Sequence, residues 1–360
     1  MELDFRSFDK NSGLDKQRTL FKECFPETID TTSSSQEHYR WKFHSKLGEM
    51  ESAEYCAKEG EDIIGYYAAI PYYYTFQGKT LRTGMVCDVM TGVKARGKGV
   101  FTKLGLYSTN EMKNRGFDLT TGYPIRPEVI PGHLKVGWKK TIELPLFGRF
   151  IRFDSFLKNK KLGIIAPFIN LVYSSLIYIY GAVTLPKKGE FATTVYTSAE
   201  IDKIGGLFAF YEKWQSEIPI ALSKDNFFIK WRLGAPGQKY YLLVLRENSN
   251  IVGVLVAREV TKENVPCMGV LDIAVLNGYH HKSAILLHEL IRLSTSKKRE
   301  LVLVMISNFW ARVYGLKKSL FWKTPFKFFL ITKNLSRAIT ENEIMKESNW
   351  HVMWIDSDDL

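Results

Sequence analysis

Two stretches of the chain repeat the same order of hydrophobic and polar positions. Each begins with a helical segment that carries a single tryptophan, at residues 39–43 and 229–233. Each continues with two apolar runs separated by a short polar turn, at 54–67 and again at 241–255. Short apolar runs bounded by polar turns are typical of strands, so each stretch predicts a helix followed by a β-hairpin. Because the order and the spacing match, we interpret the chain as an internal repeat of one α/β unit.

The first copy continues into a basic, glycine-rich turn between a strand and a helix. The apolar run 84–90 predicts the strand, residues 104–112 predict the helix, and the turn at 96–99 reads Arg-Gly-Lys-Gly. Glycines let a backbone turn tightly and approach a ligand closely. The first amides of a helix point outward without partners, at the positive end of its dipole. The turn therefore predicts a cradle for an anion such as a pyrophosphate.

This turn and its surroundings resemble motif A of the GNAT acyltransferases, whose core is Arg/Gln-x-x-Gly-x-Gly/Ala. Phe101 replaces the last small residue of that core, so its side chain must face away from the phosphates. A second strand is expected at 117–122, one helix after the first, as in a right-handed crossover between parallel strands. The closing Tyr-x-x-x-Gly-Phe of the family corresponds to residues 133–138, with histidine in place of the tyrosine. The resemblance covers roughly residues 1–150.

The resemblance implies an α/β (α+β) fold with two GNAT-like domains in tandem, each a mixed sheet flanked by helices. We expect an N-terminal domain that binds acetyl-CoA at 1–150, a hydrophobic connector at 151–190 and a C-terminal domain at 191–360. The second copy is expected to be degenerate, because residues 277–282 (Asn-Gly-Tyr-His-His-Lys) keep only one glycine. Its two histidines lack a third ligand at metal-binding spacing. This domain would shape the acceptor site or a dimer contact.

In GNAT enzymes the pantetheine arm of acetyl-CoA inserts between the two parallel strands, and its pyrophosphate meets the turn. The resemblance thus implies cofactor contacts in one segment and at one tyrosine. These residues are Val89, Met90, Thr91, Arg96, Gly97, Lys98, Gly99, Val100, Phe101, Thr102 and Tyr123. Acetyl-CoA is the expected cosubstrate, and no metal is expected.

Acyl transfer needs a neutral amine, a polarised carbonyl and a proton for the departing thiolate. His133 takes the place of the family's acid and can exchange protons near neutral pH, or it merely fills that position on the helix. Asp88 is expected to orient the amine or accept its proton, or else to hold the strand. Arg126 is expected at the acceptor. Residues 350–359 alternate like a final strand, and Asp356 and Asp358 either anchor the acceptor or belong to a solvated acidic tail.

Composition adds three expectations. The net charge of +12 favours an anionic partner, but no nucleic-acid-binding signature is present, so nucleic acid is not expected. Four cysteines without paired spacing, and no signal-peptide core, indicate the cytoplasm. Residues 162–185 carry no charge and are long enough to cross a bilayer, but proline, asparagine and serines interrupt them. We expect a buried linker helix or a homodimer contact, and a peripheral membrane contact stays open.

The length, the tandem plan and the Gly-Tyr-Pro-x-Arg segment at 122–126 most resemble bacterial enzymes that acetylate aminosugars, including those on nucleoside diphosphates. The leading hypothesis is therefore an acetyl-CoA-dependent N-acetyltransferase of bacterial polysaccharide biosynthesis, in which the amine attacks the thioester directly. The alternatives are an aminoglycoside-type or peptidoglycan-type acyl transferase and a non-catalytic acyl-CoA sensor.

Overall fold

The computed structural model describes residues 3–29, 31–44, 48–184 and 189–358, with side chains described throughout except at 177–184. The first half contains these elements: β1 (Asp4–Ser7), α1 (Leu14–Cys24), α2 (Gln36–His44), β2 (Ala53–Glu59), β3 (Asp62–Phe76), β4 (Lys79–Thr91), α3 (Val100–Asn114), β5 (Leu119–Gly122), α4 (Ile130–Lys135) and β6 (Lys139–Phe150). The connector contains α5 (Asp154–Asn159) and α6 (Ala166–Thr184).

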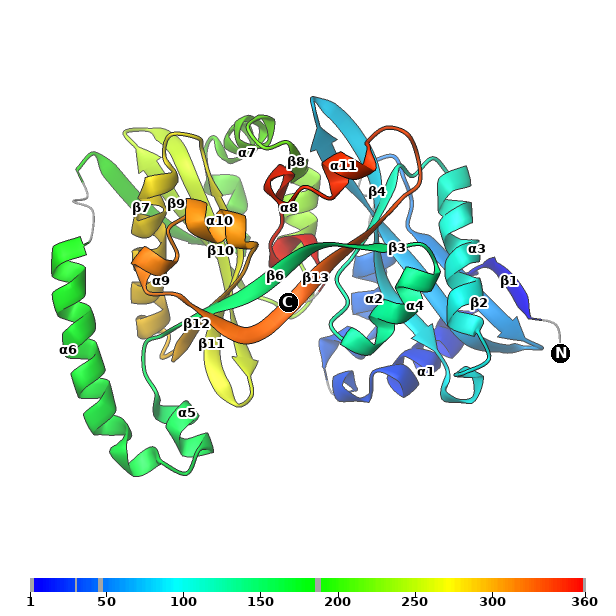
Figure 1. Cartoon of the computed structure of the whole chain (residues 1–360), viewed down its shortest axis with the longest axis horizontal. Coiled ribbons are helices and arrows are strands. Elements are labelled where there is room, and N and C mark those ends of the chain that lie inside the picture. Colours follow the sequence, from blue (N-terminus) through cyan, green and yellow to red (C-terminus); the bar gives the residue numbers. More distant parts are fainter. Residues whose placement is uncertain (1–2, 30, 45–47, 185–188, 359–360) are drawn as a thin grey trace.

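The second half repeats this order (Figure 1). Its elements are β7 (Phe191–Thr197), α7 (Leu207–Ser216), β8 (Ile220–Leu222), α8 (Asn226–Leu233), β9 (Tyr240–Glu247), β10 (Asn250–Lys262), β11 (Val265–Val275), α9 (Ser283–Ser296), β12 (Leu301–Met305), α10 (Asn308–Val313), β13 (Trp322–Asn334), α11 (Glu341–Ile344) and β14 (Trp350–His351). In both copies a tryptophan-bearing helix precedes an antiparallel hairpin, as the sequence pattern predicts.

The strands of both halves form one mixed sheet with helices packed on it, and the expected α/β class is confirmed. The strand order is β1-β2-β3-β4-β5-β13-β6-β12-β11-β10-β9-β7. Strand β13 of the second half pairs with β5, whereas β6 of the first half pairs with β12. These two exchanged strands also pair with each other and cross the middle of the molecule together (Figure 1). Strand pairing therefore crosses the domain boundaries expected at 150 and 191.

Two tryptophans mark an approximate two-fold relation between the copies. The rings of Trp41 on α2 and Trp231 on α8 stack with centroids 5.0 Å apart and planes 13° apart. Each indole N–H donates to the backbone carbonyl oxygen of the other tryptophan, at 2.9 and 2.8 Å. Such reciprocal contacts arise when two equivalent surfaces meet across a two-fold axis.

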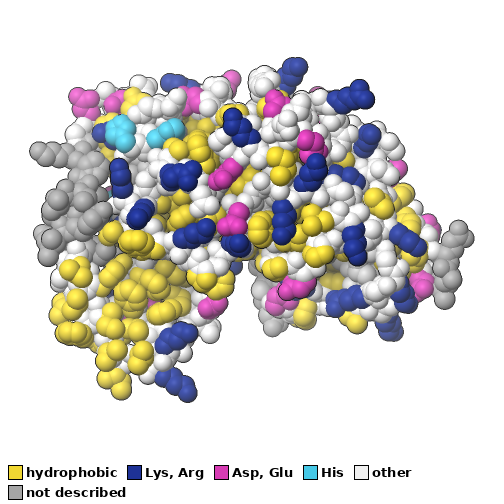
Figure 2. Space-filling model, viewed as in Figure 1, with side chains coloured by type: hydrophobic (Ala, Val, Ile, Leu, Met, Phe, Trp, Pro, Cys, Tyr) yellow, Lys and Arg dark blue, Asp and Glu magenta, His cyan; other side chains and the backbone are white. Residues whose placement is uncertain are grey.

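The connector differs from its expected buried state. One side of α6 faces the body of the protein, where Asn170 accepts from the amide of Phe153 and the Tyr173 hydroxyl donates to the carbonyl of Phe150. The other side is apolar and exposed (Figure 2). Phe168 on this side is 70% exposed. The expectation of a helix buried within the chain is therefore wrong for the described part of 162–185. Within the described ranges, no helix is both long enough and apolar enough to span a membrane.

The last described residues form a strand only at their start. Trp350 and His351 pair with β8, and residues 354–356 then form a single 3₁₀ turn. The sequence predicts a strand that extends to Asp359, and for the described residues after His351 this prediction is wrong. The Asp356 carboxylate accepts from the amide of Met353 and closes the turn instead. Asp359 lies outside the described residues.

Candidate active site

A cavity opens where β4 and β5 separate. The parallel pairing of these strands ends at Val86 and Gly122, while β4 continues to Thr91. The cavity has a volume of about 280 Å³. It is lined by Phe21, Phe25, Glu27, Thr28, Ser33, His38, Lys42, residues 86–89 and 122–126, Val129, His133, Ile331 and Asp358. Among the expected site residues it thus brings together Asp88, Val89, Tyr123, Arg126, His133 and Asp358.

The glycine-rich turn lies beyond the end of β4 and begins α3. Gly97 and Gly99 have φ angles of +77° and +76°, a conformation that glycine adopts without the steric cost of a side chain. No hydrogen bond joins the amides of residues 97 and 99–102 to another described part of the chain. A Cβ atom at either glycine would meet no atom within 4 Å, so other parts of the protein leave the backbone open at both positions. The turn has the geometry of an anion cradle.

Phe101 faces away from this cradle, as the sequence requires. Its ring packs edge-on against His133, with centroids 5.1 Å apart. A Cβ added at Gly132 would meet the same ring at 2.6 Å, so α4 approaches Phe101 closely. The bulky residue therefore joins α3 to α4 and leaves the amide face of the turn clear.

Asp88 lies at a β-bulge. Residues Met90 and Cys87 of β4 pair with Tyr66 and Ala68 of β3, so one extra residue is accommodated on β4. Asp88 itself has φ of +48°, in the left-handed region that non-glycine residues seldom adopt. A bulge changes the direction in which side chains point, and at this bulge the adjacent residues Cys87 and Asp88 both line the cavity.

A buried ion-pair cluster forms the floor of the cavity. The Lys42 ammonium on α2 donates to Asp88 at 2.8 Å and to Asp358 at 2.7 Å. Burial alone would lower the pKa of Lys42, but the two carboxylates raise it well above its ordinary value. Burial would likewise raise the pKa of Asp358, yet Lys42 keeps it below the usual range. Lys42 is therefore a permanent cation, and Asp358 a permanent anion, near neutral pH.

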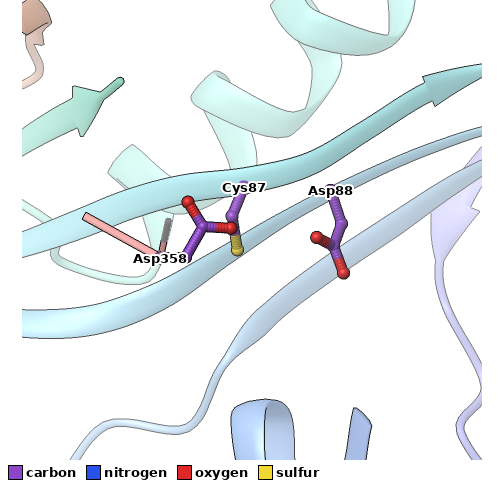
Figure 3. Close-up of side chains that lie close together, drawn as sticks. All are labelled: Cys87, Asp88 and Asp358. Carbon is purple, nitrogen blue, oxygen red and sulfur yellow. The ribbon is translucent and has the colours of Figure 1, made fainter. Parts of the chain in front are cut away.

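Figure 3 shows Cys87, Asp88 and Asp358 around this floor. One potential ligand atom from each lies within 4.8 Å of the others, the sole such group among the described residues. The Lys42 ammonium already bridges the two carboxylates, so a cation is supplied by the protein itself. Burial raises the pKa of Cys87 well above its ordinary value, which keeps it a thiol and a poor nucleophile. All four cysteines are buried and free.

His133 is buried in a setting that opposes its expected role as the acid. Its ring lies edge-on to Phe101 and Trp138, and its Nδ1 has no hydrogen-bond partner in the described chain. Burial lowers its pKa to about 4. The imidazole is therefore neutral near pH 7 and has no imidazolium proton to give to a thiolate.

Asp356 does not line the cavity but lies behind it. Its side chain is fully buried and accepts from the Tyr74 hydroxyl at 3.2 Å. The Tyr74 hydroxyl in turn lies 3.4 Å from the hydroxyl of Tyr123, a residue that lines the cavity. The expectation that Asp356 touches the acceptor is corrected: it connects to the site only through two tyrosines.

Arg126 forms part of the cavity wall. Its guanidinium donates to the backbone carbonyl of Cys24 at 3.1 Å and pairs with Glu27. The side chain is 46% exposed, so it can still reach a ligand at the cavity mouth. This contact also fixes the segment after β5 to the end of α1.

Sequence reasoning missed several residues of this site. Lys42 is the central one, and His38 lies one helical turn before it on α2. Burial lowers the pKa of His38 to about 4. One feature of the sequence could have indicated Lys42: it stands between Trp41 and Phe43 in a helix, and burial of these aromatic side chains would bring the lysine close to the protein interior.

Comparison with known proteins agrees with this geometry. Residues 7–140 match the family model described as an acetyltransferase (GNAT) domain. Residues 7–140 are therefore a GNAT acetyltransferase domain. Enzymes of this fold typically use an acyl-CoA. No curated protein sequence matches the chain.

Solved structures share the fold over nearly the whole chain. A GCN5-related N-acetyltransferase from Anabaena variabilis superposes with a TM-score of 0.64 at 8% identity, over 93% of this chain and 74% of that one. A probable N-acyltransferase from Enterococcus faecalis gives 0.63 at 10% identity, over 93% and 73%. N-myristoyltransferase from Saccharomyces cerevisiae, solved with myristoyl-CoA, gives 0.57 at 12% identity, over 92% and 79%. At these identities the likeness concerns the fold alone.

Proposed function

We propose that this protein transfers an acetyl group from acetyl-CoA to the amine of a small acceptor, which attacks the thioester directly. The observation that carries the proposal is the row of unbonded amides at 97 and 99–102, which opens beside the gap between β4 and β5. These amides, with Arg96 and Lys98, would bind the pyrophosphate. The pantetheine would lie in the gap, along residues 89–91.

The acceptor amine would enter the cavity at the carboxylates. Asp358 is the more accessible of the two, with 28% of its side chain exposed against 10% for Asp88. Asp358 would attract the incoming ammonium group. Asp88, held by Lys42 and lying 4.0 Å from Arg18, would position it, and the ammonium would release one proton to water at the cavity mouth before the neutral amine attacks.

Tyr123 is better placed than His133 to protonate the leaving thiolate. Burial raises the pKa of Tyr123 well above its ordinary value, so its hydroxyl is protonated near neutral pH and can donate a hydrogen bond to the departing sulfur. Tyr74 and Asp356 lie behind it and can exchange protons with it. A donor of this kind promotes the reaction because negative charge develops on the sulfur as its bond to the acyl carbon breaks.

An aminosugar is the acceptor class that we propose. A cavity of about 280 Å³ is at the lower end for ligand pockets and suits one sugar ring. A nucleoside diphosphate would remain outside, near the exposed guanidinium of Arg126. Aminoglycoside-type and peptidoglycan-type acceptors, and a non-catalytic sensor role, are the alternatives. We place the activity in the cytoplasm, where the four free cysteines stay reduced.

The test compares two glycines with equal backbone strain. Gly99→Glu adds a carboxylate at the cradle, whereas Gly78→Glu adds one at the β3–β4 turn, where φ is +74° and the space is equally open. Calorimetry should show CoA affinity reduced at least about tenfold in Gly99→Glu, since one lost charged hydrogen bond is worth about 1.5–3 kcal/mol. Gly78→Glu should bind CoA as the unmodified protein does. Equal affinities in the two variants would refute the cradle.

A thiol-release assay over a panel of amines separates the remaining alternatives. Turnover with aminosugars supports the proposed acceptor, and turnover with aminoglycosides or peptidoglycan amines alone replaces it. Tight CoA binding without release of thiol with any amine would identify a sensor.

A further inference from the structure

The connector presents an apolar surface to solvent. Eight large hydrophobic side chains of this segment are exposed, and we call them the connector patch: Phe156, Leu162, Ile164, Ile165, Phe168, Leu171, Val172 and Leu176. Ile164 is 97% exposed, at the turn between α5 and α6. In Figure 2 the hydrophobic side chains gather over the region where Figure 1 places these two helices. A contiguous apolar surface of this kind marks an interaction site.

The patch follows one face of α6. Phe168, Leu171, Val172 and Leu176 recur at the three- and four-residue spacing that places side chains on one side of a helix. The opposite face is held to the body through Asn170 and Tyr173. The helix therefore uses its more polar contacts internally and directs its apolar face outward. This is the reverse of an ordinary surface helix.

Charge identifies what covers the patch. Lys158, Lys160 and Lys161 are exposed beside its most protruding residue, and Lys187 and Lys188 follow the helix in sequence. Between Asp154 and Glu190 the chain has no acidic residue. Segments that lie in the interface of an anionic membrane typically combine protruding apolar side chains with lysines and contain few acidic residues. Figure 2 shows cationic side chains at the lower end of the apolar region.

We propose that the connector patch docks this acyltransferase on an anionic lipid surface. The patch would enter the headgroup boundary while the three lysines meet anionic headgroups. Helix α6 would lie at the interface rather than cross it, consistent with the lack of a spanning helix among the described residues. A second copy of the chain is the competing occupant, but a dimer would bring the lysines of two copies to one contact, without an acid between Asp154 and Glu190 to offset them.

The experiment uses vesicle co-sedimentation of the full chain. Unmodified protein should sediment with vesicles of phosphatidylcholine and phosphatidylglycerol and much less with phosphatidylcholine alone. Ile164→Glu with Phe168→Glu should weaken binding at least about tenfold, because each apolar side chain lost from the interface is worth roughly that factor. Replacing the three lysines by glutamine should weaken binding to anionic vesicles by up to about fivefold each.

The control is Phe227→Glu on α8, where a phenylalanine is also 69% exposed but stands outside the connector. It should bind vesicles like the unmodified protein, and all variants should keep the same CoA affinity and melting temperature. Failure of the unmodified protein to bind anionic vesicles would overturn the proposal. So would a dimer, seen by light scattering, that the Ile164→Glu/Phe168→Glu variant dissociates while vesicle binding is unchanged.

Discussion

Asp356 is a buried carboxylate with two hydrogen bonds and no ion pair among the described residues. Its oxygens accept from the amide of Met353 at 2.9 Å and from the Tyr74 hydroxyl at 3.2 Å. Burial raises its pKa from 3.8 to about 7. The substitution Asp356→Asn removes the titrating proton while it keeps the shape and one acceptor oxygen. It therefore isolates the ionisation of this one group.

The sign follows from where the proton is bound. Between pH 4 and pH 7 the folded protein holds the Asp356 proton, and the unfolded chain releases it. The free energy of unfolding therefore falls as pH rises through this window, by about 1.36 kcal/mol per pH unit. Over the gap from 3.8 to about 7 this amounts to roughly 4 kcal/mol. The free energy of unfolding of the asparagine variant does not fall in this way, so the stability of the variant relative to the unmodified protein increases with pH.

Urea unfolding from about pH 5 to about pH 8 measures the effect. The free energy of unfolding of Asp356→Asn, relative to the unmodified protein, should increase by about 3 kcal/mol across that range. The lost hydrogen bond adds a cost of about 1 kcal/mol at every pH. The control is Asp358→Asn, because Lys42 holds the pKa of Asp358 below its usual range. The stability that Asp358 contributes is fully present above pH 5. The difference in the free energy of unfolding between Asp358→Asn and the unmodified protein should therefore stay constant over this range. A constant difference for Asp356→Asn would refute the reasoning.

Two further results are expected. His133→Phe should lower kcat less than about threefold at pH 7, because the ring is already neutral. Tyr123→Phe should lower kcat at least about tenfold and keep the CoA affinity. Steady-state kinetics measure both effects, and a larger loss of kcat in His133→Phe than in Tyr123→Phe would restore His133 as the acid. Lys224→Met should cost about 3–5 kcal/mol of unfolding free energy, because it leaves Asp272 buried and unpaired. Lys42→Met should cost less, since its carboxylate partners are partly exposed, and equal losses in urea unfolding would contradict this.

Local chemistry was sufficient to predict the anion cradle and the repeated hairpins. The turn at 96–99 depends on two glycines with positive φ, and Phe101 could only face away from the amides. Apolar positions predicted the helix α3 and the strand β4, although the predicted ranges 104–112 and 84–90 cover only the middle of α3 and the later part of β4. These features depend on contacts between residues near in sequence, which is why the residue order contains them.

The rest of the site depends on distant contacts. Lys42 and Asp358 are 316 residues apart in sequence, and no local pattern relates them. The exchange of β6 and β13 likewise follows from the assembly of both halves. The connector was misjudged because an uncharged run of this length ordinarily predicts burial, whereas α6 is held by only a few polar contacts and stays exposed.

Comparison of the two copies shows how the second half can contribute to the site of the first. Both bulged strands carry an aspartate paired with a lysine, but Lys224 and Asp272 are sealed, with 1% and 0% of their side chains exposed. Arg232 follows Trp231 as Lys42 follows Trp41, and so occupies the equivalent position. It donates to the carbonyls of Ile355 and Ser357 at 3.4 and 3.2 Å.

These bonds hold the final described segment on both sides of Asp356, at Ile355 and Ser357. Asp358 comes directly after the carbonyl that Arg232 binds, and its carboxylate reaches Lys42 at the cavity floor. The residue that matches Lys42 in the second copy thus positions the chain that completes the ion-pair cluster in the first. In the proposed acyl transfer the second half would be required even without binding CoA, because without it the ion-pair cluster would lose one of its two carboxylates.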